Sequence, residues 1–503
     1  MSAKQNKPNI RLCIATALLV TISGCASQNP ATLPGGTIEP ERSAGTERSV
    51  GNLVERRGAA IAQGGVLLAR SFPIDPVNRP VSNVLSLTSY TLKSAAGFLQ
   101  RLAIGATQFP ALETRPIPQL STSQTMNLDQ WERDLDRTIG RKSSQGEISF
   151  LVDGDEFFGR MESVFRNASK SIDIRTYIFD NDDYAVAIAD LLREKSGDVE
   201  VRVMVDGIGN LIAMQSDSSS MATDFIAPVS IQQYMERGSE VRVRTLSNPW
   251  MTGDHTKTII VDHKIAFVGG MNIGREYRYD WHDLMMEVRG PVVDQLQFDA
   301  DKAWVKAGFM GDFARFFRHL AGPRQNAEDA GYPVRILYTR EFDSEIYRAQ
   351  LDAIRRARSY IVIENGYFSD DATLYELARA RRRGVDVRVI LPEDGNHNTH
   401  DASNAVAINK MLRNGIRVYR YPGMSHVKAA IIDGWASVGS ANFDKLSLQV
   451  NKEVNLATSH GPAVDELMHK VFIPDLAVST EVTRPVEVTL QARLMEVVVD
   501  EVL

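Results

Sequence analysis

The chain has 503 residues, of which 43% are hydrophobic and 24% charged, a globular composition that excludes collagen, coiled-coil rods and wholesale disorder. This length suits two or three domains, each large enough to bury its own core. The formal net charge is −6, and loss of the basic N-terminal residues Lys4, Lys7 and Arg11 would make it more negative, so bulk charge gives no support to a nucleic-acid partner.

Residues 1–24 are predicted to be a signal peptide. Basic residues precede an apolar run of about eleven residues from Leu12 to Ile22, which fits a signal-peptide core and is too short to span a bilayer. The run ends in ISGC, which resembles the lipobox of bacterial lipoproteins and implies lipidation of Cys25. No aspartate follows this cysteine, which favours the periplasmic face of the outer membrane. A plain secretory signal or an amphipathic first helix is the alternative.

Residues 25–146 are predicted to form a tether and an N-terminal extension. Prolines divide this segment into short pieces, and residues 26–57 are interpreted as the tether. One amphipathic helix is expected from Val81 to Ala106, where it either packs on the main body or lies on lipid. No cysteine lies beyond residue 25, so the folded body has no disulfide framework and no thiolate metal site.

Beyond residue 146, helices and strands alternate in an order that occurs twice. VEVRVMVDG, from Val199, and VDVRVILPED, from Val385, are alike enough to indicate an internal duplication. We therefore predict two α/β domains, at 147–325 and 326–503, each with a mixed or parallel sheet covered on both faces. In the first domain we expect a helix at 156–168, an alternating strand at 171–179, a helix at 184–194 and a strand at 199–205. Their counterparts are a helix at 346–358, a strand at 360–364, a helix at 372–383 and a strand at 385–391.

A polar motif of the form HxKxxxxD occurs once in each half. Its members are His255, Lys257 and Asp262 in the first half and His426, Lys428 and Asp433 in the second. A glycine turn, an asparagine and an acid follow each copy, and such a repeat is implausible by accident in a chain with nine histidines. These following residues are Gly270, Asn272 and Asp283 in the first half and Ser440, Asn442 and Glu453 in the second.

The spacing within the motif fits an extended strand. Residues two apart on a strand face the same side, so the histidine and lysine of each copy are expected to point together. Asp262 and Asp433 fall at the far end, where we expect them to hold local structure rather than touch substrate. Two halves placed about a pseudo-twofold axis would bring two imidazoles, two ammonium groups and two amides to one site, which suits a phosphodiester. A metal centre is disfavoured, because a lysine between the ligands repels a cation.

These motifs, with GGMNIGREY, GSANFD, NKE and WHDLMMEVRGP beside them, resemble the phospholipase D superfamily, or HKD family, and specifically its bacterial cardiolipin synthase and phospholipase D-like branch. The resemblance covers residues 147–475 and implies two tandem αβαβα sandwich domains that form a pseudo-twofold pair. It also implies a covalent phosphohistidine intermediate and no cofactor. His255 would be the nucleophile, and His426 the general acid and later the base that activates the acceptor.

By the same resemblance, the other motif residues complete the candidate catalytic set or bind phosphate. Asp262 and Asp433 belong to the two catalytic triplets of the motif. Asp283 and Glu453 would orient the imidazoles by accepting the proton of the ring nitrogen that does not face phosphorus. The candidate phosphate ligands are Lys257, Lys428, Asn272, Asn442 and Ser440. The asparagines could instead only cap the turns, and the other seven histidines, among them His282, are expected to be structural or surface residues.

The leading hypothesis is a membrane-anchored phosphatidyltransferase or phospholipase D that acts on glycerophospholipids, with the lipidated Cys25 as its anchor and no nucleic-acid partner. We expect a monomer with an internal pseudo-dimer. The sequence leaves open hydrolysis or cardiolipin-type synthesis, and two other functions: a phosphodiesterase or nuclease with the same histidines, and a non-catalytic lipid-binding lipoprotein. The aromatic stretch from Ala303 to Leu320 is either a lipid-facing lip of the active site or a core helix.

Overall fold

The computed structural model describes residues 45–105, 109–121, 124–214, 218, 220–222, 224–246, 252–323, 331–395 and 398–488. The predicted signal peptide at 1–24 and the predicted lipidation residue Cys25 lie outside the described residues. Across the described part of the chain, every helix falls short of the length and hydropathy needed to cross a bilayer.

The first half forms a mixed sheet with the strand order β1-β7-β6-β5-β2-β3-β4. β2, β3 and β4 are mutually parallel, because helices connect them, whereas the other neighbours are antiparallel. The strands are β1 (Ser144–Val152), β2 (Ser171–Thr176), β3 (Glu200–Asp206), β4 (Arg242–Leu246), β5 (Thr258–Val261), β6 (Ile265–Gly269) and β7 (Leu284–Arg289).

The second half repeats this order as β8-β15-β14-β13-β10-β11-β12, with the short β16 (Thr480–Glu481) added at the edge and β9 (Asp343–Ser344) paired to β8. β1 and β8 pair antiparallel, so the two halves share one continuous sheet. The predicted duplication and the mixed α/β class are thereby confirmed. The strands are β8 (Tyr332–Arg340), β10 (Tyr360–Asn365), β11 (Asp386–Pro392), β12 (Arg417–Tyr421), β13 (Lys428–Ile432), β14 (Trp435–Gly439) and β15 (Glu453–Thr458).

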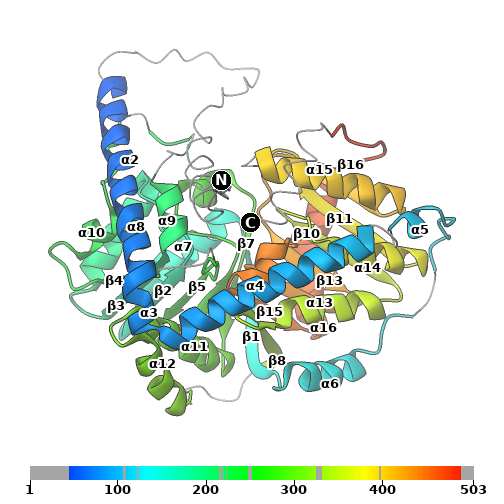
Figure 1. Cartoon of the computed structure of the whole chain (residues 1–503), viewed down its shortest axis with the longest axis horizontal. Helices are drawn as coiled ribbons and strands as arrows, with labels where there is room; N and C mark the ends of the chain where they lie inside the picture. The colour runs from blue at the N-terminus through cyan, green and yellow to red at the C-terminus, as the bar shows by residue number, and fades with distance from the viewer. Residues whose placement is uncertain are drawn as a thin grey trace, which may run out of the picture.

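Helices cover both faces of the sheet (Figure 1). In the first half α7 (Asp153–Arg166) and α8 (Asp183–Lys195) pack on one face. In the second half α13 (Glu345–Arg356), α14 (Asp371–Arg382) and α15 (Asn398–Arg413) do the same. α11 (Val292–Ala307) and α16 (Gly461–Leu467) cover the opposite faces, where one apolar core joins residues of both halves.

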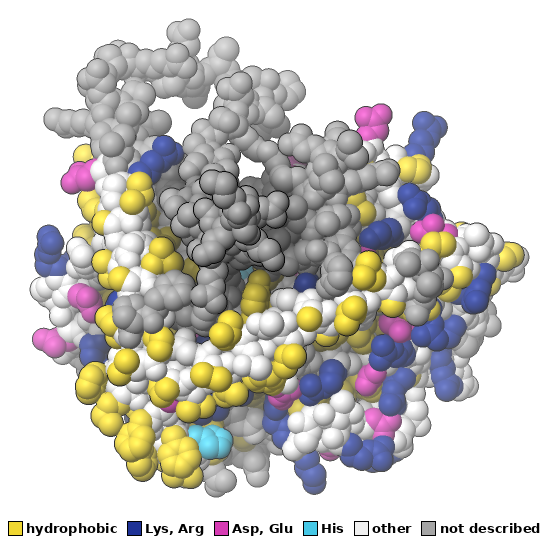
Figure 2. Space-filling model, viewed as in Figure 1, with side chains coloured by type: hydrophobic (Ala, Val, Ile, Leu, Met, Phe, Trp, Pro, Cys, Tyr) yellow, Lys and Arg dark blue, Asp and Glu magenta, His cyan; other side chains and the backbone are white. Residues whose placement is uncertain are grey.

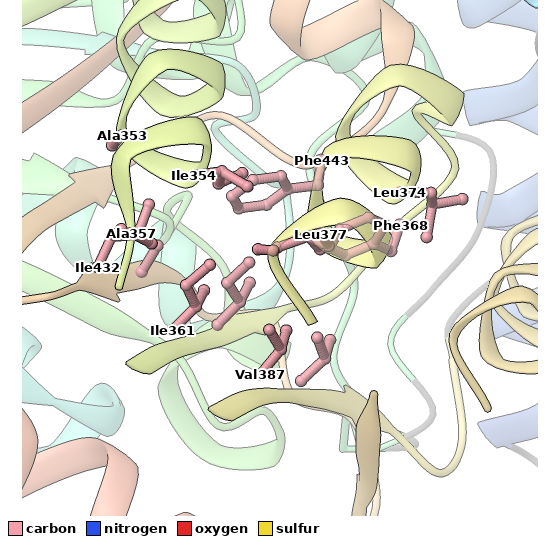
Figure 3. Packing of buried hydrophobic residues seen from close by; sticks show 14 of the residues in the cluster. Ala353, Ile354, Ala357, Ile361, Phe368, Leu374, Leu377, Val387, Ile432 and Phe443 are labelled. Atoms are coloured by element: carbon pink, nitrogen blue, oxygen red, sulfur yellow. The ribbon is translucent and has the colours of Figure 1, made fainter. Parts of the chain in front are cut away.

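β2 is shorter than predicted and is covered on both faces. The strand was expected to alternate over 171–179; it ends at Thr176, and Ile172 and Ile174 alternate with Asp173 and Arg175 as expected, although all four are buried. The polar side of β2 faces buried ion-pair partners rather than water. Its counterpart β10 is also covered on both faces: Ile361 and Ile363 pack under α13 and α14, as Figure 3 shows for Ile361, whereas Val362 faces the core shared by the halves.

The N-terminal extension is more helical than predicted. α2 (Gly45–Ala69) begins inside the segment 26–57 that we interpreted as a tether, because no proline occurs between Pro40 and Pro73 to interrupt it. α4 (Pro80–Ala103) confirms the predicted amphipathic helix and crosses the front of the molecule in Figure 1. Its expected last residue, Ala106, lies outside the described residues.

The rest of the extension belongs to the core of the second half. α6 (Leu128–Ile139) buries Trp131 edge-on against Trp435, with 5.4 Å between the ring centroids. α5 (Phe109–Glu113) adds two further buried apolar residues. The described part of the extension is therefore packed against the body rather than tethered to it.

The stretch from Ala303 to Leu320 is not a single helix. α11 ends at Ala307, and α12 (Gly311–Leu320) follows after Met310, which has a φ of 67°. The four phenylalanines of the stretch are 55–85% exposed, so the core-helix alternative is wrong for them; they are Phe309, Phe313, Phe316 and Phe317.

Candidate active site

The two histidine segments lie where the halves meet. Each segment enters its strand from outside the sheet: His255 precedes β5, which starts at Thr258, and His426 precedes β13. The expectation that histidine and lysine both lie on the strand is therefore wrong for both copies: in the first neither residue lies on β5, and in the second only Lys428 lies on β13. The His255 N–H donates to the Lys452 carbonyl (2.9 Å), and the His426 N–H donates to the His282 carbonyl (2.7 Å). Each segment thus docks on the opposite half.

The side chains of the two histidines are held by acids that are exchanged between the halves. Nδ1 of His255 lies 3.0 Å from a carboxyl oxygen of Glu453, and Nδ1 of His426 lies 2.7 Å from Oδ2 of Asp283. Both acids are fully buried. With Nδ1 of each ring occupied, its Nε2 is the nitrogen that can meet a substrate.

Lys257 and Lys428 are buried beside the histidines. Nζ of Lys257 donates to the His255 carbonyl (2.9 Å), and Nζ of Lys428 donates to the His426 carbonyl (2.6 Å). An ammonium group has three N–H donors, so each lysine keeps donors for an anion. Both lysines act electrostatically on both Asp283 and Glu453, which places the six side chains in one group.

Burial shifts this group toward its neutral forms. Desolvation lowers the pKa of Lys257 to about 7 and of Lys428 to about 8, and it raises the pKa of Asp283 to about 7 and of Glu453 to about 8. The pKa of His255 is well below its usual value, because the ring is desolvated and lies near both lysines. A neutral imidazole has a free lone pair, and a bound anion would restore the lysine charges.

The two asparagines have different environments. The Asn272 amide is used internally: its NH₂ donates to the Tyr277 hydroxyl (2.7 Å), and its oxygen accepts from the Ile178 N–H (3.1 Å). The buried side-chain oxygen of Asn442 has no hydrogen-bond partner among the described residues. The unpartnered atom of Asn442 is thus an acceptor, which can meet an N–H or O–H donor of a ligand but not a phosphate oxygen.

Ser440 does not reach the site as a phosphate ligand, which corrects that expectation. Its hydroxyl is fully buried, donates to Glu453 Oε2 (2.5 Å) and accepts from the Val454 N–H (3.0 Å). Gly270 occupies the equivalent position in the first half, where a Cβ atom would lie 2.3 Å from Oδ1 of Asp283. The Ser440 hydroxyl thus supports the longer side chain of Glu453, whereas Gly270 leaves space for the shorter side chain of Asp283.

Asp262 and Asp433 lie at the other ends of β5 and β13, which removes them from the candidate catalytic set. Asp262 accepts the N–H groups of residues 169–171, and Asp433 accepts those of Met126 and residues 358–360. Both have positive φ angles in the turn that follows the strand. Their carboxylates hold loops, as the odd spacing suggested.

A buried charge network behind each histidine was missed by the sequence analysis. Behind His255, Arg175 of β2 pairs with Asp254 (2.7 Å) and Asp299 (3.0 Å). Glu364 occupies the position of Arg175 on β10 in the other half, where Ser425 donates to it (2.7 Å). Charged residues within predicted strands were the available signal: Asp173 and Arg175 in the first half and Glu364 in the second.

His282 is the centre of the second network. Its Nδ1 lies 2.7 Å from Asp153 and its Nε2 lies 3.1 Å from Asp475, with Glu364 at 3.9 Å and the Tyr421 ring stacked on it. His282, Glu364 and Asp475 have the residue types and closeness of a metal site. Both ring nitrogens face carboxylates, however, so an imidazolium already supplies a positive charge there, and those contacts raise its pKa well above the usual value.

Comparisons with known proteins were made for the whole chain. A family model described as "Cardiolipin synthase, PLD-like domain" matches residues 161–304 and 351–472, which include both histidines and both acids. Cardiolipin synthase A of Pseudomonas fluorescens (strain SBW25) is 30% identical over 359 residues, covering 68% of this chain and 71% of that protein. Cardiolipin synthase B of Salmonella typhi is 28% identical over 322 residues, covering 62% and 76%. Phosphatidylserine synthase of Haemophilus influenzae Rd KW20 shares the fold, with a TM-score of 0.57 and 13% identity over 74% of this chain and 100% of that one.

Proposed function

Because the chain belongs to the phospholipase D superfamily, in the cardiolipin synthase family with a PLD-like domain, we propose that it transfers phosphatidyl groups between glycerophospholipid alcohols through a phosphohistidine. The observation that carries this proposal is the pair of imidazoles, each fixed by an acid of the opposite half, with two buried lysines between them. Such a group can attack a phosphodiester and stabilise its anionic oxygens.

In the first step, Nε2 of His255 forms a bond to phosphorus while the bond from phosphorus to the head-group oxygen breaks. The neutral ring of His255 supplies the electron pair. His426 gives its proton to the departing oxygen as general acid. Lys257 and Lys428 stabilise the negative charge on the phosphoryl oxygens.

In the second step, His426 takes the proton of an acceptor hydroxyl, whose oxygen attacks phosphorus as the bond from phosphorus to His255 breaks. A glycerophospholipid head-group alcohol as acceptor gives a cardiolipin-type product, and water gives phosphatidic acid. Glu453 and Asp283 keep Nε2 of each ring turned toward phosphorus, as an orienting carboxylate does in other histidine sites.

Membrane contact through α4 and α12 is part of the proposal. Exposed apolar side chains follow α4 and cluster on α12, as Figure 2 shows along the diagonal helix and at its lower left end. A patch of this kind on an amphipathic helix favours the bilayer interface. We call it the apolar face, and its members are Val81, Val84, Leu85, Leu87, Leu92, Leu99, Leu102, Phe313, Phe316, Phe317 and Leu320.

Lipidation of Cys25 would hold this face at the periplasmic side of the outer membrane. We expect the Cys25→Ser variant to lose incorporation of labelled fatty acid, while wild type incorporates it. Incorporation by the Cys25→Ser variant would exclude this residue as the anchor.

The proposed activity is tested by product analysis with purified full-length protein. We expect phosphatidylglycerol vesicles alone to yield cardiolipin and glycerol by mass spectrometry, and the His255→Ala variant to yield neither. Phosphatidic acid as the sole lipid product would identify a hydrolase. Absence of turnover on phosphatidylglycerol and on phosphatidylglycerol mixed with phosphatidylethanolamine would contradict the proposal, and cleavage of DNA would favour the nuclease alternative.

A further inference from the structure

A cavity lies beside the candidate active site and shares only Glu453 with the group of histidines, lysines and acids described above. It lies between the halves, where α11, α12 and the end of β8 meet the segment before His255. None of His255, Lys257, His426 and Lys428 lines it. Its cationic lining residues are Arg175, Lys302, Lys306, Arg315, Arg340 and Lys452.

The charges around this cavity do not balance. Its six cations face four carboxyl groups, those of Asp254, Asp299, Glu341 and Glu453. The first three are shared by several cations: Asp299 alone lies 3.0 Å from Arg175 and 2.6 Å from Arg340. Glu341 lies 3.4 Å from Lys306 and 3.8 Å from Lys452. Among the described residues, Arg315 has no ion pair.

The electrostatics of the lining favour an anion. Burial and the neighbouring Lys452 together lower the pKa of Lys306 to about 8, and Glu341, which acts in the opposite direction, is shared with Lys452. Glu453, with its pKa raised to about 8 by burial, contributes little negative charge near neutral pH. An anion in the cavity would stabilise the charged lysine and relieve repulsion between cations.

The equivalent place in the other half has the opposite charge. Glu364 stands where Arg175 stands, His282 precedes Asp283 as Lys452 precedes Glu453, and Asp153 and Asp475 complete the network. The duplication of the fold therefore does not by itself produce a cationic pocket. The excess of positive charge is a property of this one side.

The size of the cavity selects a small ligand. Its volume of about 40 Å³ has room for about three water molecules, which matches a tetrahedral oxyanion but not a sugar or an acyl chain. Guanidinium and ammonium groups are the side chains that bind phosphate oxygens. Arg315 belongs to α12, next to the exposed Phe316 of the apolar face, so the cavity adjoins the surface proposed to meet lipid.

We propose that this cavity is a second anion site, which binds the phosphate group of a phospholipid or free inorganic phosphate. The site is separate from the one between His255 and His426, and its occupancy does not require phosphatidyl transfer. The shared chemistry is a tetrahedral phosphate oxyanion held by Lys306, Arg315 and Arg340.

The test is equilibrium dialysis of the full chain against labelled inorganic phosphate. We expect two sites per chain in wild type and one in the Lys306→Gln/Arg315→Gln variant, with at least a tenfold weaker constant for the lost site. The Arg318→Gln variant is the matched control: Arg318 lies on the same helix but pairs with Asp301 at 2.8 Å, and it should keep both sites. Circular dichroism melting of each variant establishes that it is folded.

A competition arm identifies the source of the phosphate. Displacement of the label from the second site by phosphatidylglycerol vesicles, but not by phosphatidylcholine vesicles of equal area, would identify anionic lipid as the ligand. Displacement by neither, with two sites retained, would identify free phosphate. A single site in wild type, or two unchanged sites in a folded Lys306→Gln/Arg315→Gln variant, would overturn the proposal. If no phosphatidyl transfer is measured but two phosphate sites are found, the second anion site is supported and the proposed function is contradicted.

Discussion

At the scale of single residues, Asp283 and Glu453 determine how the two imidazoles are presented. Each acid belongs to the opposite half from its histidine, so the site is complete only when the halves are joined. The acids could be identified from the sequence because each lies at the same interval after an asparagine. The exchange between halves could not, because spacing along one chain does not reveal which half meets which.

The first prediction concerns these two acids. The Asp283→Asn and Glu453→Gln variants keep the volume of the side chain but replace the carboxyl group that faces Nδ1 and fixes the ring tautomer with an amide. We expect kcat for phosphatidyl transfer to fall about a hundredfold or more, with a smaller change in KM. Steady-state kinetics on phosphatidylglycerol vesicles measures both. Unchanged kcat in both variants would contradict the orienting role.

Ser440 and Asn272 show the limit of residue patterns. Each follows the histidine of its half at nearly the same interval as its counterpart in the other half, but the Ser440 hydroxyl donates to Glu453 and the Asn272 amide donates to Tyr277. A short polar side chain binds whichever partner the fold brings nearest, and that partner lies outside the motif. The same holds for His282, whose three acidic neighbours come from distant segments.

The second prediction is a pH dependence of stability at His282. Its pKa is raised well above the usual value of 6.5 in the folded protein, chiefly by hydrogen bonds to Asp153 and Asp475 that outweigh its burial. Its contribution to the free energy of unfolding is therefore fully present below pH 6.5 and is lost as the pH rises through the folded pKa. We expect His282→Asn to be destabilised more at pH 6 than at pH 9.

Urea denaturation of wild type and the His282→Asn variant at the two pH values measures this difference. The facing groups that titrate are Asp153, Glu364, Asp475 and Tyr421. Equal destabilisation at both pH values would show that the imidazole is neutral. A stoichiometric divalent ion found in purified wild type and absent from the variant would instead assign the cluster to a metal.

At the scale of elements, the turns after β5 and β13 depend on one carboxylate each. Asp433 is 1% exposed and accepts backbone N–H groups from the extension and from the segment before β10. Asp262 makes similar bonds but is less buried. Predicted elements agree well with the structure where local periodicity determines them. β2 ends at Thr176 instead of residue 179, and α2 begins inside the predicted tether, where no proline interrupts the helix.

The third prediction follows from those turns. We expect Asp433→Ala to lower the free energy of unfolding by about 3 kcal/mol, because several buried N–H donors lose their acceptor, and Asp262→Ala to lower it by less. Activity per folded molecule should remain near that of wild type in both variants. A loss of kcat in a fully folded Asp433→Ala protein would return this residue to the catalytic set.

The fourth prediction concerns α12. Burying one phenylalanine side chain in lipid contributes about 2 kcal/mol, so Phe313→Ser/Phe317→Ser should weaken binding to phosphatidylglycerol vesicles at least tenfold. Val478→Ser, which changes an equally exposed apolar residue of α17 (Ile473–Val478), is the control and should bind as wild type. Co-sedimentation with vesicles measures both. Equal binding by all three proteins would remove α12 from the membrane contact.

At the scale of the whole molecule, a duplicated chain forms one sheet and one site. The repeat of VEVRVMVDG and VDVRVILPED predicted the duplication, and the repeated strand order agrees with it. The pairing of β1 with β8 and the docking of the extension on the second half could not be predicted, because they depend on contacts between distant segments. Within the same strand order, the residues behind the two histidines carry opposite charges: Arg175 lies behind His255 and Glu364 behind His426.

The most direct test of the account is mass spectrometry of the His426→Ala variant quenched after brief incubation with phosphatidylglycerol. Without the general base, the second step should be slow, so we expect a phosphatidyl adduct on the peptide that contains His255. The double variant His255→Ala/His426→Ala should carry no adduct. An adduct on any other residue, or none on His255 in a variant that still releases glycerol, would contradict the central claim that His255 is the nucleophile of a site shared by both halves.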